Sequence, residues 1–152
     1  MRKMIYIVLL LAAVFMPVKG RDVGKLQPVE VVKVYIDRRQ VVIETDTGDL
    51  GMGGTVREAL RNLEDTTVGY VYLDTARYLL VAPGAEEVVG ELSPYLKKGT
   101  RICIAAASID PAEAASYLSS HEPGVSLGDW ESSKNPEKLV QIGERLLLEK
   151  KN

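Results

Sequence analysis

Short apolar runs rich in β-branched residues alternate along this sequence with segments of helical spacing, and this alternation restricts the fold most. The runs typical of strands cover residues 29–36, 41–45, 70–73, 78–82 and 101–106. A polar turn at residues 37–40 joins the first two runs into a predicted hairpin. Strands that alternate with helices predict an α/β fold, in which helices cover a central sheet. The opening hairpin makes this sheet mixed rather than purely parallel.

Helices are expected in four places. A T-x-x-E capping box, Thr55 with Glu58, precedes apolar residues at helical spacing. Asp110 followed by Pro111 is typical of a second helix start. Two further helices are predicted at residues 85–96 and 136–150, which gives the order β-β-α-β-(β)-α-β-α-α in a single domain.

The predicted organisation has five parts. A signal peptide at residues 1–20 is followed by a polar segment at 21–28 and the α/β domain at 29–120. A loop at 121–135 then leads into the C-terminal helix at 136–150.

Residues 1–20 have the layout of a signal peptide. Two basic residues precede an uncharged run at residues 4–16, which Pro17 ends. A helix of that length spans about 20 Å, less than the roughly 30 Å hydrocarbon core of a bilayer. We therefore expect export and cleavage between Gly20 and Arg21, and retention of the leader as a membrane anchor is the alternative.

Charge and cysteine content exclude several classes of function. The leader holds three of the 19 basic residues and none of the 21 acidic ones, so the chain beyond it carries a net charge of −5. A mildly acidic domain lacks the basic face that nucleic acids require. One cysteine with one histidine cannot build the usual structural zinc sites. We predict no cofactor, no metal and no nucleic-acid partner, and membrane contact only through an uncleaved leader.

Asp46 is the candidate catalytic residue, because Asp46-Thr47-Gly48 follows an apolar strand and matches the Asp-Thr-Gly of aspartic proteases. That chemistry needs two carboxylates that share a proton, so the chain must dimerise to supply the second. The same three residues are also an ordinary turn sequence after a strand. We expect the turn, with an exported hydrolase as the alternative.

Three other patterns have both a chemical and a structural interpretation. The glycine-rich residues 51–55 precede a helix and could cradle an anion, but their spacing matches no nucleotide motif. Cys103 could form a nucleophilic pair with His121, but it lies in an apolar strand and is expected to be buried and unreactive. The carboxylates at positions 37, 44, 46, 49 and 74 could bind calcium, but they have no EF-hand spacing. We expect structural or surface roles for all three.

Tyrosines are dense in the first half of the chain, at Tyr35, Tyr70, Tyr72 and Tyr78. A tyrosine has an apolar ring and a polar hydroxyl, so it suits both cores and interfaces. Core packing is one explanation of this density. A binding surface is the other, and Tyr70, Tyr72 and Tyr78 are its predicted residues.

The order of these elements resembles the N-terminal domain of the C subunit of spore-germinant receptors, the Ger(x)C-type lipoproteins of endospore-forming bacteria. The likeness covers residues 29–118: a strand pair, a glycine-rich loop, the E-A-L-x-x-L helix at 58–63, the tyrosine-bearing strand at 70–73, and the strands at 79–81 and 102–105. The lipid-accepting cysteine of that family is absent. The resemblance implies a single-domain, non-enzymatic relative, secreted or tethered by its leader. It would act outside the cytoplasmic membrane of a spore former by contact with a membrane-protein assembly, with no catalytic residues to carry over.

These observations predict an exported, non-enzymatic binding or assembly protein of the cell envelope, whose partner is a membrane or envelope protein. A small exported hydrolase and a secreted inhibitor are the alternatives. A cleft with two convergent carboxylates would favour the enzyme. An exposed tyrosine-rich patch would favour the binding protein.

Overall fold

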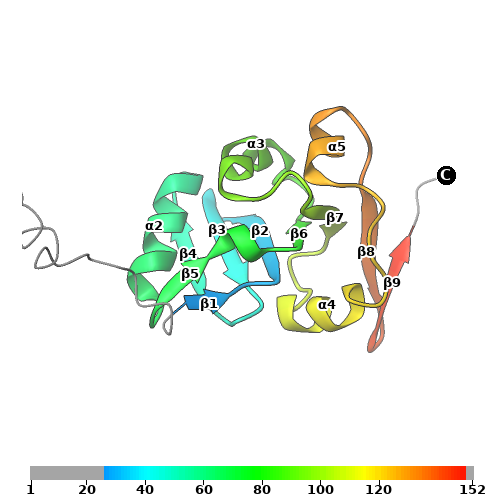
Figure 1. Ribbon diagram of the computed structural model, residues 1–152, viewed down its shortest axis with the longest axis horizontal. Coiled ribbons are helices and arrows are strands. Elements are labelled where there is room, and N and C mark those ends of the chain that lie inside the picture. Colours follow the sequence, from blue (N-terminus) through cyan, green and yellow to red (C-terminus); the bar gives the residue numbers. More distant parts are fainter. Residues whose placement is uncertain (1–25, 150–152) are drawn as a thin grey trace, which may run out of the picture.

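The computed structural model describes residues 26–149, which fold around one seven-stranded mixed sheet (Figure 1). Its strands are β2 (Val31–Asp37), β3 (Gln40–Thr45), β4 (Leu50–Gly53), β6 (Tyr78–Val81), β7 (Arg101–Ala105), β8 (Glu137–Ile142) and β9 (Arg145–Glu149). They lie in the order β4-β3-β2-β6-β7-β8-β9. The four strands β2, β6, β7 and β8 run parallel, while β3, β4 and β9 pair antiparallel with their neighbours. The predicted α/β class, mixed sheet and single domain are confirmed.

A small second sheet lies beside the large one. It pairs β1 (Leu26–Pro28) in parallel with β5 (Tyr70–Tyr72). The short helical turn η2 (Leu73–Thr75) follows β5 directly. Thr75 ties this turn to the start of the large sheet, because its Oγ1 accepts a hydrogen bond from the Val29 amide at 3.0 Å and donates to the Tyr72 carbonyl at 2.7 Å.

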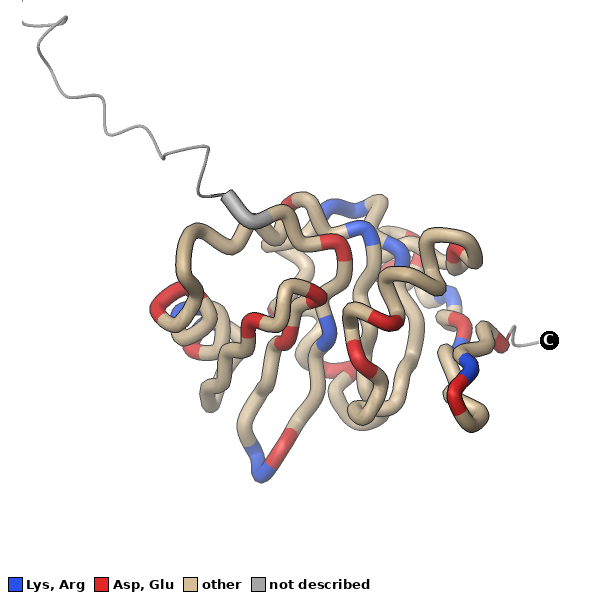
Figure 2. Tube along the Cα trace, turned by 90° about the horizontal axis from the view of Figure 1, so that it is seen from below, with Lys and Arg blue, Asp and Glu red and all other residues tan. Residues whose placement is uncertain are grey.

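The predicted opening hairpin is confirmed as β2 and β3. Asp37 pairs with Gln40, so Arg38 and Arg39 form a two-residue loop. Their φ angles of 46° and 69° lie in the left-handed region, which a type I′ turn requires at both central positions. Beyond this turn, basic and acidic residues are interspersed along the trace (Figure 2).

Helices cover both faces of the large sheet (Figure 1). One face carries α2 (Val56–Thr66), α3 (Val89–Leu92) and α5 (Leu127–Glu131), and the other carries α4 (Pro111–Leu118). Because side chains alternate along a strand, the central strands β2, β6 and β7 supply both cores. In β6, for example, Leu79 and Val81 pack under α2 and α3, while Tyr78 and Leu80 pack under α4.

Helix α2 begins as its capping box predicts. Thr55 Oγ1 accepts a hydrogen bond from the Glu58 amide at 3.2 Å, and the Glu58 carboxylate accepts one from the Gly54 amide at 2.8 Å. The helix buries Ala59, Leu60 and Leu63 against the sheet. It lies so close to β4 that a Cβ on Gly51 would come within 2.2 Å of the Ala59 carbonyl oxygen. Glycine is therefore required at this crossing.

The predicted C-terminal helix at residues 136–150 is wrong, because this segment forms the hairpin β8–β9. Its apolar residues fit a helical repeat about as well as they fit two alternating strands, so local spacing cannot decide. Gly143, with a φ of 63°, opens the two-residue turn between Ile142 and Arg145. Strand β8 then pairs with β7, a long-range interaction that the local pattern does not report.

Four other boundaries differ from the prediction. The loop at 121–135 contains α5, which Ser126 and Asp129 cap with a reciprocal capping box. The polar segment at 21–28 includes β1, and the glycine-rich residues 51–55 include part of β4. The helix at 85–96 is divided into η3 (Glu86–Val88), α3 and η4 (Ser93–Tyr95). The order within the described residues is therefore β-β-β-β-α-β-β-α-β-α-α-β-β.

Candidate functional site

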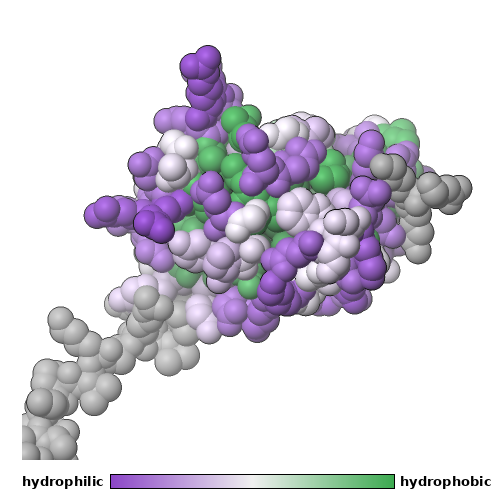
Figure 3. Space-filling model, turned by 90° about the horizontal axis from the view of Figure 1, so that it is seen from above, coloured by the Kyte–Doolittle hydropathy of each residue, from purple (hydrophilic) through white to green (hydrophobic). Residues whose placement is uncertain are grey.

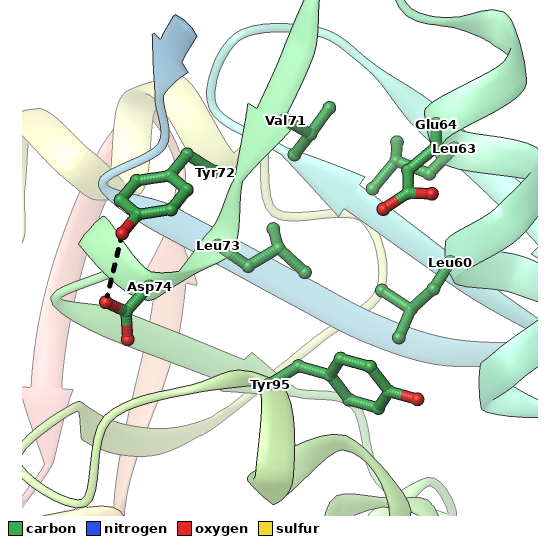
Figure 4. A pocket seen from close by; sticks show the side chains of 8 residues that line it. All are labelled: Leu60, Leu63, Glu64, Val71, Tyr72, Leu73, Asp74 and Tyr95. Carbon is green, nitrogen blue, oxygen red and sulfur yellow. Dashed lines mark hydrogen bonds between the residues drawn. The ribbon is translucent and has the colours of Figure 1, made fainter. Parts of the chain in front are cut away.

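A pocket of about 200 Å³ opens between α2, β5 with its turn η2, and η4 (Figure 4). Its apolar floor has four side chains: Leu60 and Leu63 come from α2, and Val71 and Leu73 come from the β5–η2 segment. Leu60 and Leu63 belong to the main core, and Val71 and Leu73 pack against it. The pocket thus opens onto the core between α2 and the β5–η2 segment. It is smaller than the roughly 300–1,000 Å³ sites that bind drug-sized molecules.

Alternation along β5 decides which of its side chains face the pocket. Val71 and Leu73 point toward α2, whereas the Tyr72 ring points to the other side of the strand (Figure 4). There its hydroxyl donates a hydrogen bond to the Asp74 carboxylate at 3.5 Å. Of the two tyrosines that the sequence offers on this strand, Tyr72 lines the pocket at its edge, while Val71 and Leu73 form the floor.

The rim of the pocket combines an aromatic ring with two carboxylates. Tyr95, exposed at 44%, closes one side, and the Glu64 carboxylate points into the opening from α2 (Figure 4). Asp74 lies 3.9 Å from Lys97 Nζ. Glu64 has no hydrogen-bond or ion-pair partner within residues 26–149. Such an arrangement suits an apolar group that carries a positive charge beside it.

The three predicted binding tyrosines do not share one surface. Tyr72 lines the pocket, and Tyr70 is an exposed residue of the same strand. The prediction is wrong for Tyr78, which is 0% exposed and lies under α4 on the opposite face of the sheet. The reason is that β6 is a central strand with both faces covered, so every residue of it is buried.

Asp46 forms a structural link in the folded chain. Its carboxylate accepts hydrogen bonds from the Glu30 amide at 3.1 Å and the Val31 amide at 3.2 Å, which fixes the start of β2. Burial raises the pKa of Asp46 above its ordinary value, although these backbone amides lower it in part. No second carboxylate within the described part of the chain bonds to it. The hydrogen bonds of Asp46 to the backbone of β2 and of the residue before it agree with the turn interpretation of Asp46-Thr47-Gly48.

Cys103 is buried, as expected. Its side chain lies in the core under α4, and burial raises the pKa of its thiol to about 12, with the nearby Glu137 carboxylate contributing. His121 does not pair with it, because its ring stacks on Tyr117 with centroids 4.2 Å apart. The glycine-rich segment offers no free anion site either, since the Glu58 carboxylate already occupies the Gly54 amide.

Lys33 is a buried polar residue that sequence analysis missed. Its Nζ lies 2.6 Å from Glu44 Oε2 and donates hydrogen bonds to the carbonyls of Ala107 and Ile109 at 3.0 and 2.8 Å. These contacts hold the loop after β7 against β2. The signal was a single lysine inside the apolar run of residues 31–36, which only a buried partner could satisfy.

Within residues 26–149, no cluster of three or more histidine, cysteine, aspartate or glutamate side chains is arranged to hold a metal ion. The same residues include no helix with the length and hydropathy needed to cross a membrane. Comparison with protein-family models, curated proteins and solved structures yields no match. The resemblance to the Ger(x)C N-terminal domain therefore stays a prediction.

Proposed function

We propose that this chain is an exported, non-enzymatic binding protein of the cell envelope, and that it binds its partner through the pocket between α2, β5 and η4. The observation that carries the proposal is the apolar floor beside the Glu64 carboxylate, which has no hydrogen-bond or ion-pair partner among the described residues. The face that carries α2 and α3 also has apolar surface between hydrophilic side chains (Figure 3). Exposed apolar surface with a polar rim is typical of an interaction site.

The chemistry of the pocket defines what it binds. Its size suits one large apolar side chain, and its rim carboxylates favour a lysine or arginine next to that side chain. The partner is therefore a peptide segment of an envelope protein with an apolar residue beside a basic one. An acidic neighbour at the same position would face Glu64 and be repelled.

The proposal of export rests on residues 1–20, which lie outside the described residues. Its test is N-terminal sequencing of the protein recovered from its native host. We expect the mature chain to begin at Arg21 and to be found outside the cytoplasm. An intact Met1 in a soluble cytoplasmic fraction would contradict export.

The binding site is tested by methyl NMR of the protein titrated with two short probes, acetyl-Leu-Lys-amide and acetyl-Leu-Glu-amide. We expect the Leu-Lys probe to shift the methyl signals of Leu60, Leu63, Val71 and Leu73, and the Leu-Glu probe to shift them far less. Glu64→Gln should weaken binding of the Leu-Lys probe several-fold while leaving the fold intact, because Glu64 is exposed.

The matched control is Glu87→Gln, which removes an exposed carboxylate that does not line the pocket. Its affinity for the Leu-Lys probe should equal that of the unmodified chain. Equal shifts from both probes, or shifts scattered away from the four floor residues, would overturn the pocket as the binding site.

The spore-envelope setting is a further part of the proposal and follows from the resemblance alone. It predicts that the protein accumulates in the membrane fraction during sporulation and that its loss delays germination. Expression only in vegetative cells, together with normal germination after deletion, would contradict the spore setting. The proposed binding function would be unaffected by that result.

A further inference from the structure

The strand β9 forms one edge of the large sheet and pairs with β8 on its inner side (Figure 1). Its outer side pairs with no other strand of the described residues. A two-residue turn makes Ile142 and Arg145 a hydrogen-bonded pair, so Arg145, Leu147 and Glu149 bond to β8. The backbone groups of Leu146 and Leu148 therefore point away from the sheet. Within residues 26–149, Leu146 has no partner on that side.

The hairpin also exposes apolar side chains next to this edge. Ile142 is 62% exposed and Leu147 is 45% exposed, and both lie on the same face of the hairpin as Val140. An open strand edge with exposed apolar residues is a template for pairing with another strand.

We propose that β9 pairs antiparallel with β9 of a second copy of this chain, around a two-fold axis at Leu147. The sequence of the strand, Arg145-Leu-Leu-Leu-Glu149, is complementary to itself in this register. Arg145 lies opposite the partner's Glu149, and Leu146 lies opposite the partner's Leu148. Both Arg–Glu pairs lie on one face with the two Leu147 side chains between them, so the contact has the symmetry of an isologous dimer.

Tyr117 limits the strength of this pairing. In a single copy, its hydroxyl accepts a hydrogen bond from the Leu148 amide at 3.1 Å. Of the four backbone hydrogen bonds across the new edge, two use the free amides of Leu146 and form directly. The other two use the Leu148 amides, and each must displace a Tyr117 hydroxyl. Tyr117→Phe should therefore strengthen dimerisation.

The strand contact is small, so the dimer belongs with weak, reversible associations. Sedimentation equilibrium of the full chain over a wide concentration range is the measurement. Arg145→Glu and Glu149→Arg each place like charges opposite one another and should weaken the dimer about tenfold. The double variant, Arg145→Glu with Glu149→Arg, restores opposite charges and should restore the dimer. A double variant as weak as either single one would overturn the register.

A cross-link tests the axis directly. Leu147 and the partner's Leu147 form a non-hydrogen-bonded pair with Cα atoms about 4.5 Å apart, a distance that a disulfide spans. Leu147→Cys should therefore yield a disulfide-linked dimer on mild oxidation, without interference from the buried Cys103. The control is Val68→Cys, at a position 89% exposed outside the hairpin. Equal cross-linking of both variants, or none at Leu147→Cys, would overturn the proposal, and circular dichroism would verify that each variant is folded.

Discussion

The two edge strands of the large sheet, β4 and β9, differ in how their outward backbone groups are hydrogen-bonded. At the β4 edge, α2 lies against the strand and its side chains bond to two of the outward backbone groups: Asn62 Oδ1 accepts from the Met52 amide at 2.9 Å, and Thr66 Oγ1 donates to the Leu50 carbonyl at 3.3 Å. At the β9 edge, the Tyr117 hydroxyl accepts a hydrogen bond from the Leu148 amide, and the backbone groups of Leu146 have no partner within residues 26–149. Helix side chains therefore cover the β4 edge, here called the closed edge, more completely than the β9 edge, here called the open edge.

The difference follows from chain connectivity. The helix α2 comes directly after β4, so a short link folds it back over the strand that precedes it. Strand β9 is the last described element, and α4, which supplies Tyr117, comes from much earlier in the chain. An edge is closed most completely where a neighbouring element folds back onto it. Association with a second copy is therefore expected at β9 and not at β4.

The largest expected effect comes from breaking the closed edge. Gly51→Ala would place a Cβ within 2.2 Å of the Ala59 carbonyl oxygen and 2.6 Å of Leu63 Cβ. Helix α2 must then move away from β4, and we expect a loss of about 2–4 kcal/mol in the free energy of unfolding. Chemical denaturation measures it.

Gly90→Ala is the matched control for this change. Gly90 lies in α3, with nothing within 4 Å of its added Cβ. The substitution should leave stability within about 1 kcal/mol of the original, or raise it slightly. An equal loss for both substitutions would mean that the contact between α2 and β4 is not the cause.

The second prediction compares the two faces of the hairpin at the open edge. Leu139 is buried under α4, so Leu139→Ala should cost about 2–4 kcal/mol through the cavity that it leaves. Leu147 lies on the uncovered face, and Leu147→Ala should cost less than about 1 kcal/mol in a single copy. Thermal denaturation at low protein concentration measures both. Similar losses would show that the exposed face is covered in solution.

Sequence patterns predicted the closed side of the molecule better than the open side. The hairpin β2–β3 and the start of α2 depend on local signals, namely a polar turn and a capping box, and both were placed correctly. The hairpin β8–β9 was predicted as a helix, because its leucines fit two periodicities and only pairing with β7 decides between them.

The candidate site was predicted only in part, for the same reason. Tyr70, Tyr72 and Tyr78 were the predicted residues of a binding surface, and of these Tyr72 lines the pocket. The floor, however, joins Leu63 of α2 to Leu73 of the β5–η2 segment, and their meeting depends on how the helix packs. Tyr78 was misplaced because its local sequence does not reveal that β6 is central in the sheet.

The third prediction compares the side chains that cover the two edges. Asn62→Ala removes the acceptor of the Met52 amide, and Tyr117→Phe removes that of the Leu148 amide. Each loss should cost about 0.5–1.5 kcal/mol. Hydrogen exchange at the Met52 and Leu148 amides measures the two losses separately. At high concentration, Tyr117→Phe should regain protection at Leu148 through dimerisation, whereas Asn62→Ala should not regain it at Met52.

The smallest effect is expected in acid, at helix α5. The pKa of Asp129, in the capping box of α5, is lowered from 3.8 to about 2 by hydrogen bonds from Lys134 and Ser126. Because the folded pKa lies below the unfolded one, ionised Asp129 stabilises the fold above pH 3.8 and loses this effect as the pH falls through about 2. Asp129→Asn should therefore lower the thermal midpoint slightly at neutral pH, and the difference should disappear toward pH 2. A difference that stays constant across that range would mean that the charge of Asp129 does not support α5.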